Sequence, residues 1–197
     1  MEAVFSATVA ADADLMARLR AGDREALGDL VERHKDALVN YLTRLTGRRE
    51  RGEELAQEAF VRLLQAVPRY REEGKLLPYL YRIATNLARS EDRRERRFRF
   101  FALAAVRNGD DPVPAIDPDG GADRLLREET QRVVGAALAA LPLRFRVPVT
   151  LYAIEGWSYE AIADTLGTSV GTVKSRIHRG RERLRERLAP YWQGGLA

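Results

Sequence analysis

Cysteine is missing from this chain of 197 residues, and only two histidines, His34 and His178, are present. The lack of cysteine excludes disulfides, thiolate metal sites and cysteine nucleophiles, and it is typical of a protein from a reducing compartment. Two histidines that lie far apart in the sequence offer little to a histidine-rich metal site or a hydrolytic triad. The composition therefore argues against an enzyme, and we expect no catalytic residue, no bound metal and no cofactor.

Long hydrophobic runs are missing as well. No apolar segment approaches the roughly 20 residues that span a bilayer. The first eleven residues contain one acid, Glu2, and no base, which is unlike a targeting segment. We therefore expect a soluble, cytoplasmic protein without membrane insertion. The length suits one large domain or two small ones.

Arginine, by contrast, is abundant. Charged residues make up 31% of the chain, and arginine supplies 30 of the 33 basic residues, although the net charge is only +4. The guanidinium group binds phosphates, base edges and carboxylates more readily than an ammonium group does. The composition therefore favours partners of those three kinds.

Helical periodicity runs through residues 12–97 without any strand-like alternation, so we predict an all-α protein whose N-terminal domain is a helical bundle. One helix is expected after an N-cap at Asp23, and a second is expected to end at Pro68. A third opens near Pro78 and continues into the arginine-rich stretch 93–97. The predicted apolar stripes comprise Leu27, Leu30, Val31, His34, Leu38, Tyr41, Leu42 and Leu45 on the first helix, and Leu55, Ala59, Phe60, Leu63, Leu64 and Val67 on the second.

The composition changes after residue 98: residues 99–123 contain three prolines, three glycines and five aspartates. This composition predicts a flexible acidic linker over 98–127. The stretch 117–120 matches the start of a calcium loop, but the later ligands of such a loop are missing, so a solvated linker is the better interpretation. The aromatic residues ahead of it are expected to cap the N-terminal core. They are Phe98, Phe100 and Phe101.

A second, smaller helical domain is expected over 128–190, and its stretch 157–188 predicts a helix-turn-helix. Ser158 is placed to cap a short helix, Gly167 to end it in the left-handed conformation, and Ser169 to cap the next helix. Residues 174–187 hold seven bases against two acids. The alternative is an ordinary surface helix that is rich in charged residues and has no binding function. The coincidence of capped turn, short helix and cationic helix favours DNA binding in the major groove.

The side chains expected at DNA fall into two groups along this second helix. Those in its first two turns can reach base edges, and those further along suit phosphates. The first group comprises Thr172, Lys174, Ser175 and Arg176, and the second comprises Arg179 and Arg183.

Several motifs resemble those of the extracytoplasmic-function (ECF) sigma factors of bacterial RNA polymerase. Region 4 of that family is similar to the segment that begins at Leu141-Pro142, contains EGWSYEAIA and ends in VGTVKSR. Region 2 is similar to ELAQEAFVR at 54–62 and YLYRIATNLA at 79–88. The resemblance implies a dissociable specificity subunit that has no active site and carries promoter recognition and melting to the core polymerase. It also implies two helical domains, with region 2 over 12–97 and region 4 over 128–190.

Polymerase contacts follow from the resemblance. The exposed face of the helix at 54–62 would dock on the β′ clamp helices, although this segment taken alone reads as a solvated helix face. Region 4 would contact the β flap and the minus-35 element. The acidic linker would thread the channel that later holds RNA, or act as a plain tether. An anti-sigma partner is possible, and the free chain is expected to be a monomer. The expected polymerase-binding residues are Glu54, Gln57, Glu58 and Arg62.

Promoter opening traps bases that leave the stack, and it uses aromatic side chains together with cations along the backbone. The resemblance places reading and melting of the minus-ten element at the loop 71–77 and the following helix. Two residues depart from the pattern of the family. Tyr79 stands where the family usually has tryptophan, and Ser90 stands where it often has aspartate. The alternative interpretation is that Tyr79 and Tyr81 are simply core residues. The expected residues are Tyr79, Asn86, Arg89, Arg93 and Arg94.

Two other functional classes compete. A self-sufficient helix-turn-helix repressor or response-regulator output protein needs a dimer with two recognition helices about 34 Å apart, or a receiver domain. No receiver-like alternation of strands and helices occurs in the sequence. A nuclease needs clustered carboxylates or an activated nucleophile, and the acids here are scattered along helices or gathered in the linker.

Overall fold

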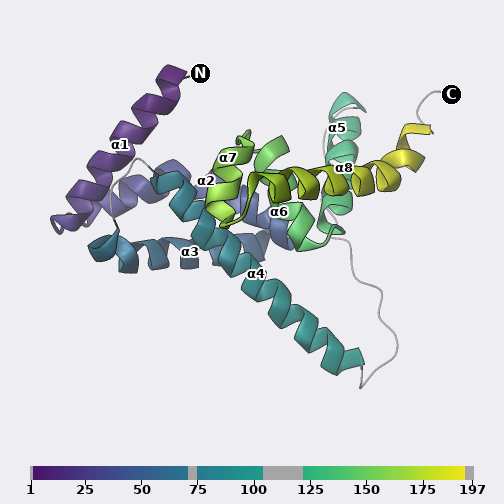
Figure 1. The fold of residues 1–197 in the computed structure, drawn as a ribbon, viewed down its shortest axis with the longest axis horizontal. Helices are drawn as coiled ribbons and strands as arrows, with labels where there is room; N and C mark the ends of the chain where they lie inside the picture. The colour runs from purple at the N-terminus through teal and green to yellow at the C-terminus, as the bar shows by residue number, and fades with distance from the viewer. Residues whose placement is uncertain (1, 71–74, 104–121, 194–197) are drawn as a thin grey trace. The chain divides into compact units, whose positions relative to one another are not determined.

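The computed structural model describes residues 2–70, 75–103 and 122–193, and it contains only helices over these ranges (Figure 1). The predicted all-α fold is therefore confirmed for the described residues. In chain order the helices are α1 (Glu2–Arg20), α2 (Glu25–Thr46), α3 (Arg49–Ala66), the short 3-10 helix η1 (Val67–Arg69), α4 (Leu76–Leu103), α5 (Ala122–Ala139), α6 (Leu143–Ala153), α7 (Tyr159–Leu166) and α8 (Val170–Gln193).

The chain divides into two compact units. The first comprises Met1–Thr43 and Arg49–Ala88, and the second comprises Arg44–Arg48 and Arg89–Ala197. Helix α4 continues to Leu103 and α5 begins at Ala122, so both ends of the segment 98–127 are helical. The rest of the expected linker, including the calcium-like stretch 117–120, lies outside the described residues, as do residues 71–74 of the expected minus-ten loop.

The core of the first unit is built by apolar residues of α1, α2, α3 and α4. The Tyr41 hydroxyl lies 2.7 Å from the Thr85 hydroxyl, and the Tyr41 ring centre is 4.7 Å from that of Tyr81. Tyr81 is therefore a core residue. One member of the predicted stripes is wrong: Leu64 is 43% exposed. It lies on the outward side of α3, where the neighbouring Val61 is exposed as well.

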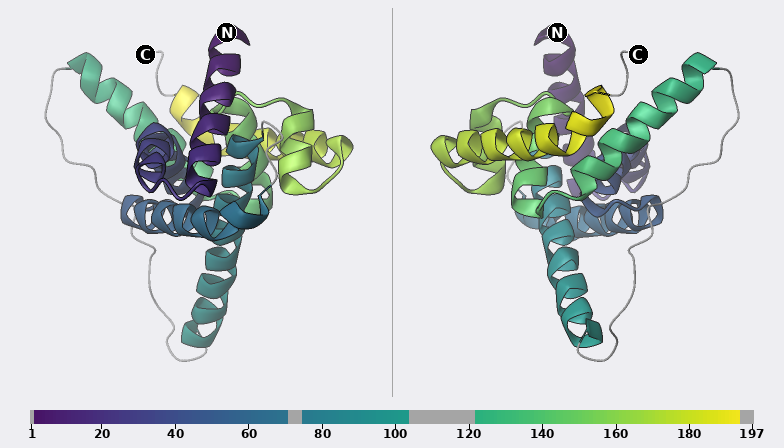
Figure 2. Two further views of the ribbon diagram at one scale, coloured as in Figure 1. Left: turned by 90° about the vertical axis from the view of Figure 1, so that its left-hand side faces the viewer. Right: turned by 90° about the vertical axis from the view of Figure 1, so that its right-hand side faces the viewer.

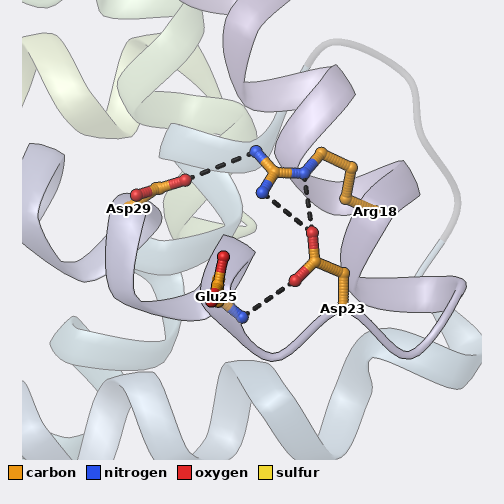
Figure 3. Close-up of polar contacts among 4 residues, drawn as sticks. All are labelled: Arg18, Asp23, Glu25 and Asp29. Carbon is orange, nitrogen blue, oxygen red and sulfur yellow. Dashed lines mark hydrogen bonds and ion pairs between the residues drawn. The ribbon is translucent and has the colours of Figure 1, made fainter.

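A polar corner joins α1 to α2 (Figure 3). The Asp23 carboxylate accepts a hydrogen bond of 2.9 Å from the Glu25 backbone N–H, which confirms the predicted cap of α2. Arg18 donates to the same carboxylate at 2.8 Å and to Asp29 at 3.3 Å. The hydrogen bond from Arg18, together with the backbone donors, holds the pKa of Asp23 below its ordinary value. The corner therefore favours the charged carboxylate.

This corner predicts a pH-dependent contribution to stability. A carboxyl group whose pKa is lowered by folding stabilises the fold above its ordinary pKa, here 3.8, and that contribution disappears as the pH falls through the lowered pKa. Asp23→Asn keeps a cap acceptor but has no charge to lose. We expect its melting temperature to lie below that of the wild type at neutral pH, with the gap closing near pH 2, as measured by circular dichroism. Asp14→Asn, on an exposed position of α1, is the control, and a gap for Asp23→Asn that does not change with pH would contradict the account.

Close approach of α2 and α3 requires glycine at position 52. A Cβ atom built on Gly52 would lie 2.8 Å from the backbone nitrogen and 3.0 Å from the Cα atom of Thr43. Backbone atoms cannot give way as the end of a flexible side chain can. The absence of a side chain at Gly52 therefore sets the spacing of the two helices.

We expect Gly52→Ala to destabilise the protein by about 1–3 kcal/mol, the usual effect of overpacking a core. Gly28→Ala is the matched control. Gly28 is helical like Gly52, but it is exposed, and a Cβ atom there meets nothing within 4 Å. That change is expected to stabilise α2 by about 0.5–1 kcal/mol, since alanine loses less backbone entropy than glycine. Chemical unfolding of both variants measures the difference, and equal effects of the two changes would exclude this role of Gly52.

The second unit packs α6 and α8 against the end of α5. Its buried cluster contains Leu138, Leu141 and Val149, with Leu184 packed against it. A Cβ atom on Gly180 would lie 2.6 Å from a Val149 methyl group, so α8 crosses α6 closely at this glycine.

A half-buried arginine, Arg146, caps the end of α5. Arg146 donates hydrogen bonds to the carbonyls of Ala139 and Leu141, the latter at 2.7 Å. Burial lowers the pKa of Arg146 to about 10, so the group is still a cation at neutral pH. A cation on the last carbonyls of a helix stabilises its C-terminus.

One expectation about the aromatic residues at the end of α4 is wrong. Phe98 was predicted to cap the N-terminal core, but it is 75% exposed. Helix α4 continues past this residue instead of ending there, and its direction carries Phe98 into solvent. The side chains of Phe100 and Phe101 lie outside the described part of the chain.

Candidate nucleic-acid interface

Helices α7 and α8 form the predicted helix-turn-helix (Figure 2, green to yellow), and local capping signals set their ends. The Ser158 hydroxyl accepts a hydrogen bond of 3.1 Å from the Ala161 backbone N–H and thereby caps α7. Gly167 ends α7 with φ +62° and ψ +47°, the left-handed conformation that glycine adopts most easily. The Ser169 hydroxyl accepts from the Thr172 N–H at 3.2 Å and caps α8. All three capping predictions are confirmed.

Helix α8 has a buried side and a cationic side. Val173 and Ile177 are buried, and Val170, Leu184 and Leu188 are half-buried. The side chains predicted to contact DNA lie away from this stripe. Of these, Lys174, Ser175, Arg179 and Arg183 are exposed, and Thr172 and Arg176 are half-buried.

A groove runs between the first turn of α6 and the first turns of α8. The expected DNA-contacting residues Thr172, Ser175, Arg176 and Arg179 line it from α8, and Arg144 and Phe145 line it from α6. Arg144 was not predicted from the sequence. Its place in the first turn of a helix carries no sign that α8 will pack beside it, so no pattern in the sequence could have found it.

A second groove lies further along α8 and has mixed charge. It is lined by Arg179, Arg183 and Arg187 but also by Glu182 and Glu186. Glu182 also pairs with His178 at 3.2 Å. Carboxylates beside arginines repel a phosphate, so the first groove suits an anionic backbone better than the second.

Lys174 lies beside an aromatic stack. The rings of Tyr152 and Tyr159 are stacked with centres 4.7 Å apart and planes at 7°. The Lys174 Nζ lies 5.6 Å from the centre of the Tyr159 ring, within the range of a cation–π interaction. A hydrogen bond with Tyr152 raises the pKa of Tyr159, so this hydroxyl stays neutral at physiological pH. The stack therefore offers the lysine an uncharged platform beside α8.

Helix α4 carries all of the residues expected at the minus-ten element, and Asn86, Arg89 and Arg93 follow three- and four-residue steps that place them along one side of the helix. The Tyr79 ring is half-buried, lies 5.1 Å from the Tyr70 ring and has the Arg82 guanidinium 5.0 Å from its centre. Asn86, Arg93 and Arg94 are exposed, and Arg89 is half-buried. Tyr79 thus retains an accessible part.

Helix α3 presents the polar face expected at the polymerase. Glu54, Gln57, Glu58 and Arg62 are all exposed. Arg62 donates to Glu58 at 2.8 Å, and Arg51 pairs with Glu54. The exposed Val61 and Leu64 lie on the same helix. These two apolar residues were not expected on the polar face, because the apolar repeat of α3 is wider than its buried stripe.

Metal ligands do not gather anywhere in the described residues: no group of three or more histidine, cysteine, aspartate or glutamate side chains is placed to hold an ion. Over the same residues, no helix combines the length and the apolar character needed to cross a bilayer.

Comparison with known sequences finds two families on this chain. Residues 30–98 match Sigma-70 region 2, and residues 131–184 match Sigma-70, region 4. The chain is 42% identical over 176 residues to the ECF RNA polymerase sigma factor SigE of Mycolicibacterium smegmatis, a match that covers 86% of this chain and 65% of the relative. It is 32% identical to the ECF RNA polymerase sigma-E factor of Haemophilus influenzae, over 91% of this chain and 96% of the relative. The chain thus spans just under two thirds of the first relative and nearly all of the second.

Two solved structures share the fold. CnrH in complex with the cytosolic domain of CnrY matches with a TM-score of 0.65 and 27% identity, over 91% of this chain and 98% of the other. The sigma factor RpoE of Bartonella quintana, in complex with the anti-sigma factor NepR, matches with a TM-score of 0.65 and 25% identity, over 82% and 96%.

Proposed function

Because the chain belongs to the ECF RNA polymerase sigma factors, we propose that it directs core RNA polymerase to specific promoters and opens promoter DNA, with no active site of its own. The observation that carries the proposal is that the chain matches Sigma-70 region 2 over residues 30–98 and region 4 over residues 131–184, in that order. A repressor that acts alone requires neither region 2 nor a polymerase-binding face.

Region 4 is proposed to read the minus-35 element through α8. Arg176 lies in the first two turns, where a recognition helix reaches base edges, and Thr172, Lys174 and Ser175 flank it there. Arg179 and Arg183 lie further along the helix and are proposed to bind phosphates. The unneutralised groove at the start of α8 supports this division.

Region 2 is proposed to hold and melt the minus-ten element along α4. The half-buried Tyr79 ring offers a face on which a displaced base can stack, and Asn86 offers an amide that can bond to a base edge. Arg89, Arg93 and Arg94 extend the same side of the helix and are proposed to follow the backbone of the melted strand.

The exposed face of α3 is proposed to bind the β′ clamp helices of the core enzyme through Glu54, Gln57, Glu58 and Arg62. Region 4 is proposed to contact the β flap. Both solved relatives are bound to a second protein, and one of those proteins is an anti-sigma factor. We propose that an anti-sigma factor also restrains this chain, which is a monomer when free and acts in the cytoplasm.

The test is transcription in vitro by bacterial core polymerase on a library of random promoters, with and without this chain. We expect the chain to enrich promoters that share two short elements at a fixed separation, near positions minus 35 and minus 10. The same transcripts from core enzyme alone, or no enrichment by the loaded enzyme, would overturn the proposal.

A further inference from the structure

The groove between α6 and α8 is cationic beyond what the recognition helix alone supplies. Arg144 reaches it from α6, and Arg176 and Arg179 reach it from α8. Thr172 and Ser175 add hydroxyl groups that can donate hydrogen bonds. None of the described residues that line the groove is acidic.

These three arginines have no carboxylate partner among the described residues, unlike several other arginines of the protein. Several arginines pair with a neighbouring carboxylate, as Arg49 does with Glu53 at 2.9 Å and Arg62 with Glu58 at 2.8 Å. Within the described ranges, no carboxylate lies close enough to Arg144, Arg176 or Arg179 to form an ion pair. Three unneutralised guanidinium groups around one groove repel one another unless an anion lies between them.

A buried ring holds two guanidinium groups in place at this end of the unit. The Cζ atom of Arg144 lies 4.7 Å and that of Arg183 lies 5.0 Å from the centre of the Phe145 ring. Phe145 is only 4% exposed, so the ring is fixed by the core. Cation–π contacts of this kind limit the conformations of the Arg144 side chain before any ligand binds.

We propose that Arg144 binds a phosphate of the promoter backbone that flanks the major groove entered by α8. This inference rests on the proposed function of region 4 and assigns it a contact from outside the recognition helix. Arg144 belongs to α6, beside α8, so it faces the strand that borders the groove and not the base edges within it. Phosphate contacts fix the register of a protein on the duplex but carry no direct sequence information. Arg144 therefore contributes to affinity, and the residues of α8 determine which promoter is chosen.

The test measures how promoter binding by the reconstituted holoenzyme depends on salt. The promoter is one that the wild-type holoenzyme selects from the random library. Each phosphate neutralised adds about 0.9 to the slope of log affinity against log salt. We expect Arg144→Gln to reduce that slope by about 0.9, so that its affinity falls about 3.5-fold less than that of the wild type between 50 and 200 mM salt. Base preference in the library should not change.

Two further variants sharpen the experiment. Arg144→Lys keeps the charge, and we expect it to keep the wild-type slope. Arg185→Gln removes the same charge from an exposed position of α8 that lines neither groove, and its slope should also match that of the wild type. A slope for Arg144→Gln equal to that of the wild type, or a change in its base preference, overturns the inference. Failure of the wild-type holoenzyme to select any promoter overturns the proposed function instead, so the two failures are distinguishable.

Discussion

Holoenzyme that carries Arg176→Ala is expected to lose promoter selection while it keeps its assembly with the core polymerase. Arg176 is half-buried in the first two turns of α8 and lines the groove that we propose faces DNA. A side chain that reads a base edge contributes about 1–3 kcal/mol to discrimination. We therefore expect transcription from selected promoters to fall roughly 5- to 150-fold at limiting enzyme.

Run-off transcription from a selected promoter measures this effect, and light scattering of the mixture with core enzyme measures assembly. Arg185→Ala is the control, because it removes the same side chain from an exposed site on the same helix. If Arg176→Ala preserved promoter choice and abolished core binding, the roles assigned to α8 and α3 would have to be exchanged.

Charge reversal at Glu58 is expected to act on the opposite step. Glu58 lies exposed at the centre of the polar face of α3 and forms an ion pair with Arg62 at 2.8 Å. In Glu58→Arg a cation replaces the acid and faces Arg62 as well as any basic group on the polymerase. Like charges brought together at an interface cost several kcal/mol. We expect binding to the core enzyme to weaken by at least about tenfold.

Titration of labelled core enzyme measures the dissociation constant of the Glu58→Arg variant. Glu32→Arg makes the same change of net charge on α2, where Glu32 is likewise exposed and paired with a base, Lys35. That control should bind as the wild type does. Equal weakening by both variants would indicate a general electrostatic effect and would remove the α3 face from the polymerase interface.

Local signals account for the part of the fold that the sequence predicted well. Ser158, Gly167 and Ser169 act within a few residues of themselves, through a hydroxyl that accepts from a nearby N–H or a backbone that tolerates positive φ. The same holds for the Asp23 cap. The helix-turn-helix could therefore be placed to within a residue from the sequence.

Features that depend on packing between helices could not be predicted in this way. Arg144 reaches the groove only because α6 and α8 cross closely at Gly180. The spacing of apolar and charged residues in either helix does not predict that crossing. The apolar repeat of α3 is wider than its buried stripe. Periodicity alone therefore could not distinguish the buried Leu63 from the exposed Leu64. Phe98 was misassigned because α4 continues past it.

The decisive measurement compares promoter binding by the chain alone with promoter binding in the presence of core polymerase. Two modest DNA contacts should become effective only when the polymerase fixes the separation of regions 2 and 4. We predict that the chain alone is a monomer that binds only a small fraction of a selected promoter at physiological salt. Once core enzyme is added, a stable complex should form. A dimer that binds the promoter tightly without polymerase would contradict the account.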